Sequence, residues 1–141
     1  MKMKMICFCL LVTFGFAMAA CSDSGIRPPV ENLAIDPSAI IQGDIVFARW
    51  ASDGYYYPGF VDTISENQIG ILFLDGDEST VPVAHIIELE TALSMLALEG
   101  NWQFGGLFYP GSLSSLESMI MYYDDGDVEQ VELLQLRGTG R

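Results

Sequence analysis

Between residues 44 and 137 the chain alternates between short apolar runs and turns rich in Gly, Asp and Ser. The run 44–50 shows a two-residue period, with Ile45 and Phe47 on one face and Val46 on the other. Short strands that follow one another closely, with turns between them, are typical of all-β barrels. In the first half of this region the pattern predicts strands over 44–50, 55–64, 68–74, 79–83 and 84–89.

One pattern occurs twice in this region and defines its organisation. Six residues separate each of the only two tryptophans, Trp50 and Trp102, from a Tyr-Pro-Gly sequence, and an aromatic-x-Asp-Gly-Asp sequence follows at 73–77 and at 123–127. The Asp-Gly pairs predict tight hairpin turns, because both residue types tolerate positive φ. An internal repeat defines the structural unit. We therefore expect two small β units in tandem, over residues 40–90 and 91–141.

The second half is predicted by aligning it with the first. Residues 91–98 contain Ala, Leu and Met, which favour helices. The repeat favours a strand there, because aligning Trp102 with Trp50 places residues 96–102 over 44–50. We therefore expect strands over 95–102, 107–113, 118–123, 128–133 and 134–137.

The first twenty residues have a different character from the rest of the chain. Two lysines precede an apolar run over 5–16, which is too short to span a bilayer comfortably, and small residues follow it. This order predicts a secretory signal peptide over residues 1–20. The sequence Met18-Ala19-Ala20-Cys21 resembles the bacterial lipobox, although leucine is usual at the position of Met18. Cys21 is the predicted lipidation site; the alternative is plain secretion, with Cys21 as an ordinary residue.

The cysteine count favours lipidation of Cys21. Cys7 and Cys9 lie inside the predicted signal peptide, so after cleavage Cys21 has no disulfide partner, although exported proteins often use disulfides. Ser22 follows Cys21, and by resemblance to Gram-negative sorting this predicts a protein that is exported and lipid-anchored at the outer membrane. Residues 21–39 are polar and contain prolines, which predicts a flexible tether between the lipid and the fold.

The charge of the predicted mature chain is strongly negative. All nineteen acidic residues follow the signal peptide, whereas the only basic ones there are Arg27, Arg49, Arg137 and Arg141, which gives a net charge of −15. Such a surface repels nucleic acid, which is bound through Lys and Arg. It attracts basic proteins and cationic groups. Solubility alone also accounts for a charge of this size.

The two copies of the repeat resemble the Tudor family. The first copy, over 45–77, follows the Tudor pattern closely, and the second, over 101–127, is similar to both Tudor and plant Agenet repeats. The resemblance covers most of residues 43–137. It implies an all-β fold of two tandem small SH3-like (Tudor-like) barrels, after a signal peptide and a flexible tether.

Many Tudor domains bind methylated lysine or arginine in an aromatic cage, so the resemblance also implies candidate ligand-binding residues. A cation is attracted to aromatic ring faces by about 0.5–2 kcal/mol per contact. The family often has a further aromatic after the Asp-Gly pair, where this chain has Asp77 and Asp127. The alternative is that the rings only pack the barrels. The candidate cages are Trp50, Tyr57 and Phe73 with Asp75, and Trp102, Tyr109 and Tyr123 with Asp125.

Other chemistry has little support in the sequence. The acidic run 124–129 is able to attract calcium, but it lacks the longer spacing of a calcium loop. His85, the only histidine, is expected to be structural, and no nucleophile has a base at motif spacing. No glycine-rich phosphate loop is present. We therefore expect no enzyme activity, cofactor or metal, but a membrane-anchored module that binds a protein or basic peptide. The alternative is a structural envelope adaptor that binds partners through barrel edges.

Overall fold

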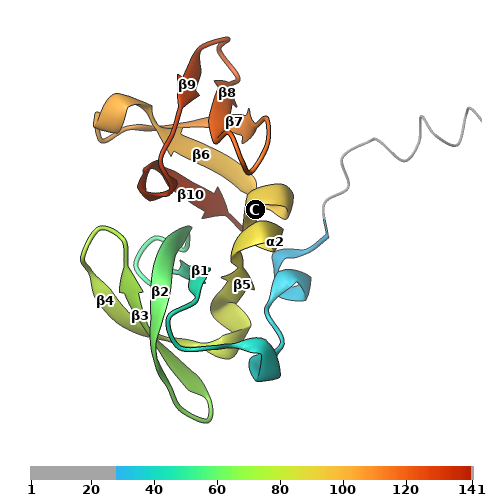
Figure 1. The fold of residues 1–141 in the computed structure, drawn as a ribbon, viewed down its shortest axis with the longest axis vertical. Coiled ribbons are helices and arrows are strands. Elements are labelled where there is room, and N and C mark those ends of the chain that lie inside the picture. Colours follow the sequence, from blue (N-terminus) through green and yellow to red (C-terminus); the bar gives the residue numbers. More distant parts are fainter. Residues whose placement is uncertain (1–27, 141) are drawn as a thin grey trace, which may run out of the picture.

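The computed structural model describes residues 28–140 and is shown in Figure 1. This part of the chain is built mainly from ten antiparallel strands, with one short α-helix and several 3₁₀ turns. The predicted all-β class is therefore confirmed. Within residues 28–140 no helix combines the length and the apolar character needed to cross a membrane. The predicted signal peptide and Cys21 lie outside the described residues.

Unit one, residues 45–88, is a meander whose last strand returns to its first. Consecutive strands from β1 to β4 pair antiparallel, and β5 pairs with β1. The strand order is therefore β4-β3-β2-β1-β5, and a 3₁₀ turn, η3 (Val83–His85), precedes the last strand. The strands are β1 (Ile45–Arg49), β2 (Tyr56–Ile64), β3 (Gln68–Phe73), β4 (Glu78–Pro82) and β5 (Ile86–Glu88).

Unit two, residues 97–139, has the same pairing. Its order is β9-β8-β7-β6-β10, and the turn η5 (Leu133–Gln135) precedes its last strand. In addition β10 pairs with β2 through Gly138 and Tyr56, which joins the two units into one sheet (Figure 1). The strands are β6 (Ala97–Asn101), β7 (Phe108–Leu113), β8 (Ile120–Tyr123), β9 (Val128–Gln130) and β10 (Leu136–Thr139).

The two Asp-Gly hairpin turns have nearly identical geometry, as the repeat predicts. Gly76 and Gly126 adopt φ values of +100° and +102°, which favour glycine. In each turn the first aspartate accepts a hydrogen bond from the backbone N–H two residues later, at 3.1 Å in both units. The side chain thus closes the turn locally. The register of both units is fixed by these turns.

The connection between the units differs from the sequence prediction. Residues 89–95 form helix α2 (Leu89–Met95), and β6 begins only at Ala97, so the prediction of a strand from residue 95 is wrong at its start. Ala92 and Leu93 of this helix are buried in the core that lies between the units. The helix propensity of these residues determines the structure here, and the helix is stabilised because its apolar face packs on the core between the units.

The segment before unit one packs on the fold. It contains two 3₁₀ turns, η1 (Val30–Leu33) and η2 (Pro37–Ala39). Between them Ile35 donates a backbone hydrogen bond to the carbonyl of Ile86 at 2.8 Å. Val30, Leu33 and Ile35 pack against the buried cores. The folded chain therefore begins before residue 40, and residues 28–39 are attached to the fold where the sequence predicts a free tether.

Two hydrophobic cores share strands β1 and β5. One lies inside unit one and includes Val46, Ala48 and Ile86. The other lies between the units, where Phe47 and Ile87 of unit one meet Leu98, Met121 and Leu136 of unit two. Successive residues of a strand point to opposite faces, so β1 and β5 contribute to both cores. The two units are thus packed face to face. This packing places the candidate cleft of unit one against unit two.

Candidate functional site

The four residues of the first predicted cage line a single cavity of about 370 Å³. Trp50 follows β1, Tyr57 lies on β2 and Phe73 ends β3, so neighbouring strands carry the three rings. The edge of one ring meets the face of another in the Trp50–Phe73 pair, with centroids 5.2 Å apart and an interplanar angle of 85°. Asp75 lies on the hairpin turn directly after Phe73 and also lines the cavity.

Further residues that the resemblance did not indicate complete this first cavity. Asp53 and Asp77 bring the number of carboxylates in its lining to three. Phe104 and Phe108 of unit two add two rings, beside Asn101 and Leu134. None of these lining residues, all within the described chain, is basic. Unit two therefore forms one wall of the cleft of unit one, and it supplies the aromatic surface that the turn at Asp77 lacks.

A hydrogen-bonded pair of side chains holds one wall of the first cavity. The Tyr57 hydroxyl donates to Asp53 Oδ2 at 2.7 Å, and Asp53 Oδ1 accepts the backbone N–H of Tyr55 at 2.9 Å. Burial raises the pKa of Tyr57, and the bond to the Asp53 carboxylate raises it further. The phenol is therefore a neutral donor at physiological pH, and its hydrogen bond holds the Asp53 carboxylate at the edge of the cavity.

Arg137 also contacts the residues that form this wall. Its guanidinium carbon lies 3.7 Å from the Tyr55 ring centroid and 4.1 Å from that of Phe108. It forms an ion pair with Glu99, with Nε 2.7 Å and Nη2 2.6 Å from Oε2, and Nη1 donates to the Tyr57 hydroxyl at 3.4 Å. Burial disfavours the charge, but the bonds to Tyr57 and Glu99 outweigh it and raise the pKa of Arg137. This arrangement, the Arg137 clamp, connects β10 to rings of both units.

In the second predicted cage the equivalent ring pair is conserved in geometry but its surroundings differ. Trp102 and Tyr123 have centroids 5.2 Å apart at 79°, as in unit one. The Tyr123 hydroxyl, however, donates to Glu129 Oε2 at 3.0 Å. Burial, Glu129 and the charge of Asp125 raise the pKa of Tyr123. Tyr109 is 40% exposed. In the second set, therefore, one ring of the pair is already hydrogen-bonded to a carboxylate of the protein itself, that of Glu129.

Glu129 is held in this position by three donors. Besides Tyr123, the backbone N–H of Gln103 donates to its Oε1 at 3.1 Å and the Gln135 side chain donates at 3.4 Å. Gln135 is buried, so these bonds satisfy a polar group inside the unit. The corresponding position in unit one is Ser79, which is too short to make such a network. The two sets of predicted cage residues therefore differ in chemistry although their hairpin turns and ring pairs match.

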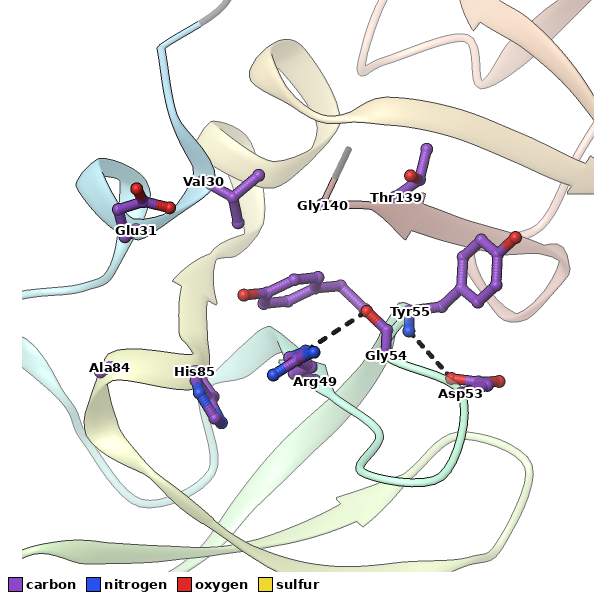
Figure 2. A pocket seen from close by; sticks show the side chains of 11 residues that line it. Val30, Glu31, Arg49, Asp53, Gly54, Tyr55, Ala84, His85, Thr139 and Gly140 are labelled. Carbon is purple, nitrogen blue, oxygen red and sulfur yellow. Dashed lines mark hydrogen bonds between the residues drawn. The ribbon is translucent and has the colours of Figure 1, made fainter.

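A second cavity, of about 400 Å³, was not predicted from the sequence (Figure 2). It lies where the 50–55 loop meets the N-terminal segment, η3 and the end of β10. Its lining includes Arg49, Tyr56, His85 and Glu31. Asp53 lines this cavity as well as the first one. Sequence reasoning missed it because its walls come from segments more than a hundred residues apart; the only available signal was the rarity of basic side chains.

Metal binding finds no support in the part of the chain that the structure describes. Residues 28–140 contain no group of three or more His, Cys, Asp or Glu side chains placed to hold a metal ion. In the acidic run 124–129, Asp125 closes its own turn and Glu129 is engaged as described above.

No protein-family model matches the chain, and no curated protein matches it. Function is therefore argued from the site alone.

Proposed function

We propose that the protein is a membrane-anchored, non-enzymatic protein-interaction module whose first cavity binds a cationic side chain, such as a methylated lysine or arginine. The observation that carries this proposal is the composition of that cavity. It combines the rings of Trp50, Tyr57 and Phe73 with the carboxylates of Asp53, Asp75 and Asp77, and no basic residue lines it.

Cation binding follows from the physical properties of this lining. A methylated ammonium loses its hydration shell more easily than an unmodified one, and its contacts with ring faces contribute about 0.5–2 kcal/mol each. Carboxylates at the rim add attraction that acts over about 8–10 Å at ordinary salt. The Arg137 clamp, built from rings and a carboxylate next to the cavity, is an internal example of this mode of binding.

We also propose that each unit is a Tudor-like SH3-fold barrel. Support comes from the shared strand order, in which the fifth strand of each unit returns to its first after a 3₁₀ turn. Two copies with matching turn geometry and ring pairs point to one fold used twice.

The binding proposal is tested by titrating the purified protein with peptides that carry lysine, trimethyl-lysine or dimethyl-arginine, with tryptophan fluorescence as the readout. Replacing Asp75 and Asp77 together by Asn keeps the side-chain oxygen that closes the turn but removes two charges. We expect affinity to fall at least about tenfold, because a charge-assisted contact is worth about 1.5–3 kcal/mol.

The matched control is the double replacement of Asp125 and Asp127 by Asn, which changes the same turn in unit two. It should leave affinity nearly unchanged. Trp50→Ala and Trp102→Ala form a second matched pair, followed by calorimetry because each change removes one of the two tryptophans. No binding by the wild-type protein, or equal losses in both members of a pair, would refute a cation site in the first cavity.

Export and lipidation at Cys21, with anchoring in the cell envelope at the outer membrane, form a separate part of the proposal, supported by residues 1–22. The test is membrane fractionation of the full-length chain carrying Cys21→Ser. We expect the variant to leave the membrane fraction, whereas Cys9→Ser, inside the predicted signal peptide, should stay in it. Unchanged membrane association of Cys21→Ser contradicts anchoring through this residue.

The alternative function is that of a structural adaptor. It is favoured by one observation: the sheet ends at β4 and β9, which leaves strand edges open for pairing with a partner. An adaptor of this kind would capture the same envelope partner whether or not the Asp75/Asp77 pair is replaced. Loss of the partner with that replacement favours the cavity.

A further inference from the structure

We propose that the second cavity binds the carboxylate of a small organic acid of about amino-acid size, such as the free C-terminal end of a peptide, with Arg49 as its main ligand-binding residue. The inference concerns a different cavity from the one proposed to bind a cation and does not depend on that function. Figure 2 shows the arrangement of Arg49, His85 and Glu31 around this cavity.

Arg49 is available to an anion, in contrast to Arg137. Within residues 28–140 these are the only two arginines, and the sole salt bridge found there is that of Arg137 with Glu99. Arg49 is exposed, and the hydrogen bond it makes is a long one of 3.4 Å from Nε to the carbonyl of Gly54. Its outer nitrogens remain able to bind a carboxylate in the two-pronged geometry that guanidinium groups favour.

The turn that carries Gly54 positions the guanidinium. Gly54 has φ of +80°, and a Cβ at this position would lie 3.3 Å from Arg49 Nη2. Glycine therefore lets the guanidinium lie directly against the turn. The turn is itself closed by backbone hydrogen bonds between Trp50 and residues 54 and 55, at 2.9 and 2.8 Å. Arg49 thus approaches the cavity from a defined direction, which reduces the entropy lost on binding.

A second group able to carry positive charge lines the same cavity. His85, the only histidine of the chain, lies at the end of η3 and is partly buried there. In a predicted mature chain with a net charge of −15, this places the single histidine and the unpaired arginine of the described region at one site. Imidazole is able to donate a hydrogen bond to an anion in either protonation state.

Two carboxylates also line the cavity, and they have different roles. Asp53 is engaged by the Tyr55 N–H and the Tyr57 hydroxyl. Glu31 is exposed, and no hydrogen bond or ion pair is found for it in the described chain. Burial raises the pKa of the Tyr56 phenol; the charge of Arg49 lowers it and that of Glu31 raises it. The charges of Arg49 and Glu31 therefore both act on the side of the cavity formed by Tyr56. Glu31 therefore opposes an incoming anion by charge repulsion.

The rest of the cavity lining is largely apolar, which favours an organic acid over an inorganic anion. Val30, Ala84 and the Tyr56 ring give it apolar surface, and Gly140 closes it, since a Cβ there would lie 3.4 Å from Tyr56 Cε2 and 3.7 Å from Val30. A volume of about 400 Å³ is within the range of small-molecule sites. A bare inorganic anion would leave the apolar part of this surface uncovered.

The test is calorimetric titration of the purified protein with N-acetyl-dialanine bearing a free C-terminal carboxylate, with its C-terminal amide, and with inorganic phosphate. We expect the free acid to bind at least about tenfold more tightly than the amide, and Arg49→Gln to weaken it by a similar factor. Arg49→Lys should retain part of the affinity, and Glu31→Gln should increase it about twofold to threefold.

Controls separate this site from the first cavity. The Asp75/Asp77 to Asn replacement should leave binding of the acid unchanged, and circular dichroism should show that the exposed Arg49→Gln change leaves the fold intact. Absence of binding by the wild-type protein, equal binding of acid and amide, or full affinity in Arg49→Gln would overturn the proposal. Phosphate binding as tight as that of the dipeptide would overturn its assignment to organic acids.

Discussion

Units one and two share a strand order, hairpin turns and a ring pair, but they carry different side chains at equivalent positions. Their hairpin turns and ring pairs agree within a few tenths of an ångström. Yet Phe73 of one ring pair corresponds to Tyr123 of the other, and Ser79 corresponds to Glu129. Turns constrain the chain through backbone geometry, so they persist, whereas interior side chains have diverged. The comparison shows that matching architecture does not imply matching binding chemistry.

The pairing of the first and last strands differs between the units in the same way. Phe47 pairs with Ile87 across β1 and β5, and the equivalent pair across β6 and β10 is Glu99 with Arg137. The first pair is fully buried in the core between the units, and the second is a partly buried ion pair beside the first cavity. At these equivalent positions unit one thus adds apolar side chains to the core between the units, while unit two carries polar groups that contact the cavity wall.

The largest expected effect is on the apolar pair. Phe47→Ala should lower the free energy of unfolding by about 3–5 kcal/mol, because it leaves a cavity in the core between the units. Urea denaturation followed by circular dichroism measures this. The matched change is Glu99→Ala, for which we expect a smaller loss. Equal losses would contradict the different roles assigned to the two pairs.

A smaller loss is expected when the Arg137 clamp is removed. Arg137→Ala should cost about 1–3 kcal/mol, since it leaves the Glu99 carboxylate partly buried without its partner. The double variant that also carries Glu99→Ala should regain part of this loss. A double-mutant cycle in urea denaturation measures the coupling. Strict additivity of the two changes would show that the ion pair contributes nothing to the association of the units.

Glu129→Ser gives unit two the residue of unit one. We expect a loss of about 1–2 kcal/mol, because the Tyr123 hydroxyl and buried Gln135 each lose an acceptor. Adding Tyr123→Phe, the residue found at position 73, should reduce this loss. Thermal melting of the single and double variants is the measurement. If the double variant is less stable than the single one, the hydroxyl has found another partner and the network matters less than proposed.

The smallest effect is on alkaline stability. The pKa of Tyr123 is raised in the folded state, so the folded protein holds this proton at a pH where the unfolded chain, with a tyrosine pKa of about 10, has released it. Its contribution to stability is therefore present below about pH 10 and is lost as pH rises above that value. Tyr123→Phe should flatten the fall in melting temperature above pH 10. The exposed neighbour Tyr122→Phe serves as control and should leave that fall unchanged.

Local features of the fold were predictable, and contacts between distant segments were not. The strands around Trp50 and the Asp-Gly turns follow from alternation and turn chemistry, which act over a few residues. Helix α2 is not predicted, because the repeat register favours a strand over residues 91–98 against their helix propensity. The packing of Val30, Leu33 and Ile35 was missed because a few apolar residues scattered through a polar segment give little local signal.

The candidate sites show the same limit. Trp50, Tyr57, Phe73 and Asp75 were predicted as one cluster and line one cavity. Phe104 and Phe108 could not be assigned to it, because they belong to the other repeat and reach the cavity only through packing of the units. Glu129 likewise reads in sequence as part of an acidic turn. The second cavity is lined by residues spread along the chain from Val30 to Gly140, so no local sequence motif indicates it.

The position of β10 has a consequence for the order of folding. This strand comes last in chain order among the described strands, yet it pairs with β2 some eighty residues earlier and carries Arg137 to the rings of unit one. Contacts of such long sequence separation form slowly, since the loop must close before they can stabilise it. During synthesis unit one therefore acquires its strands first, while its cleft stays incomplete. The cation site proposed for the first cavity would therefore be complete only once unit two has packed against unit one, and not in the first unit alone.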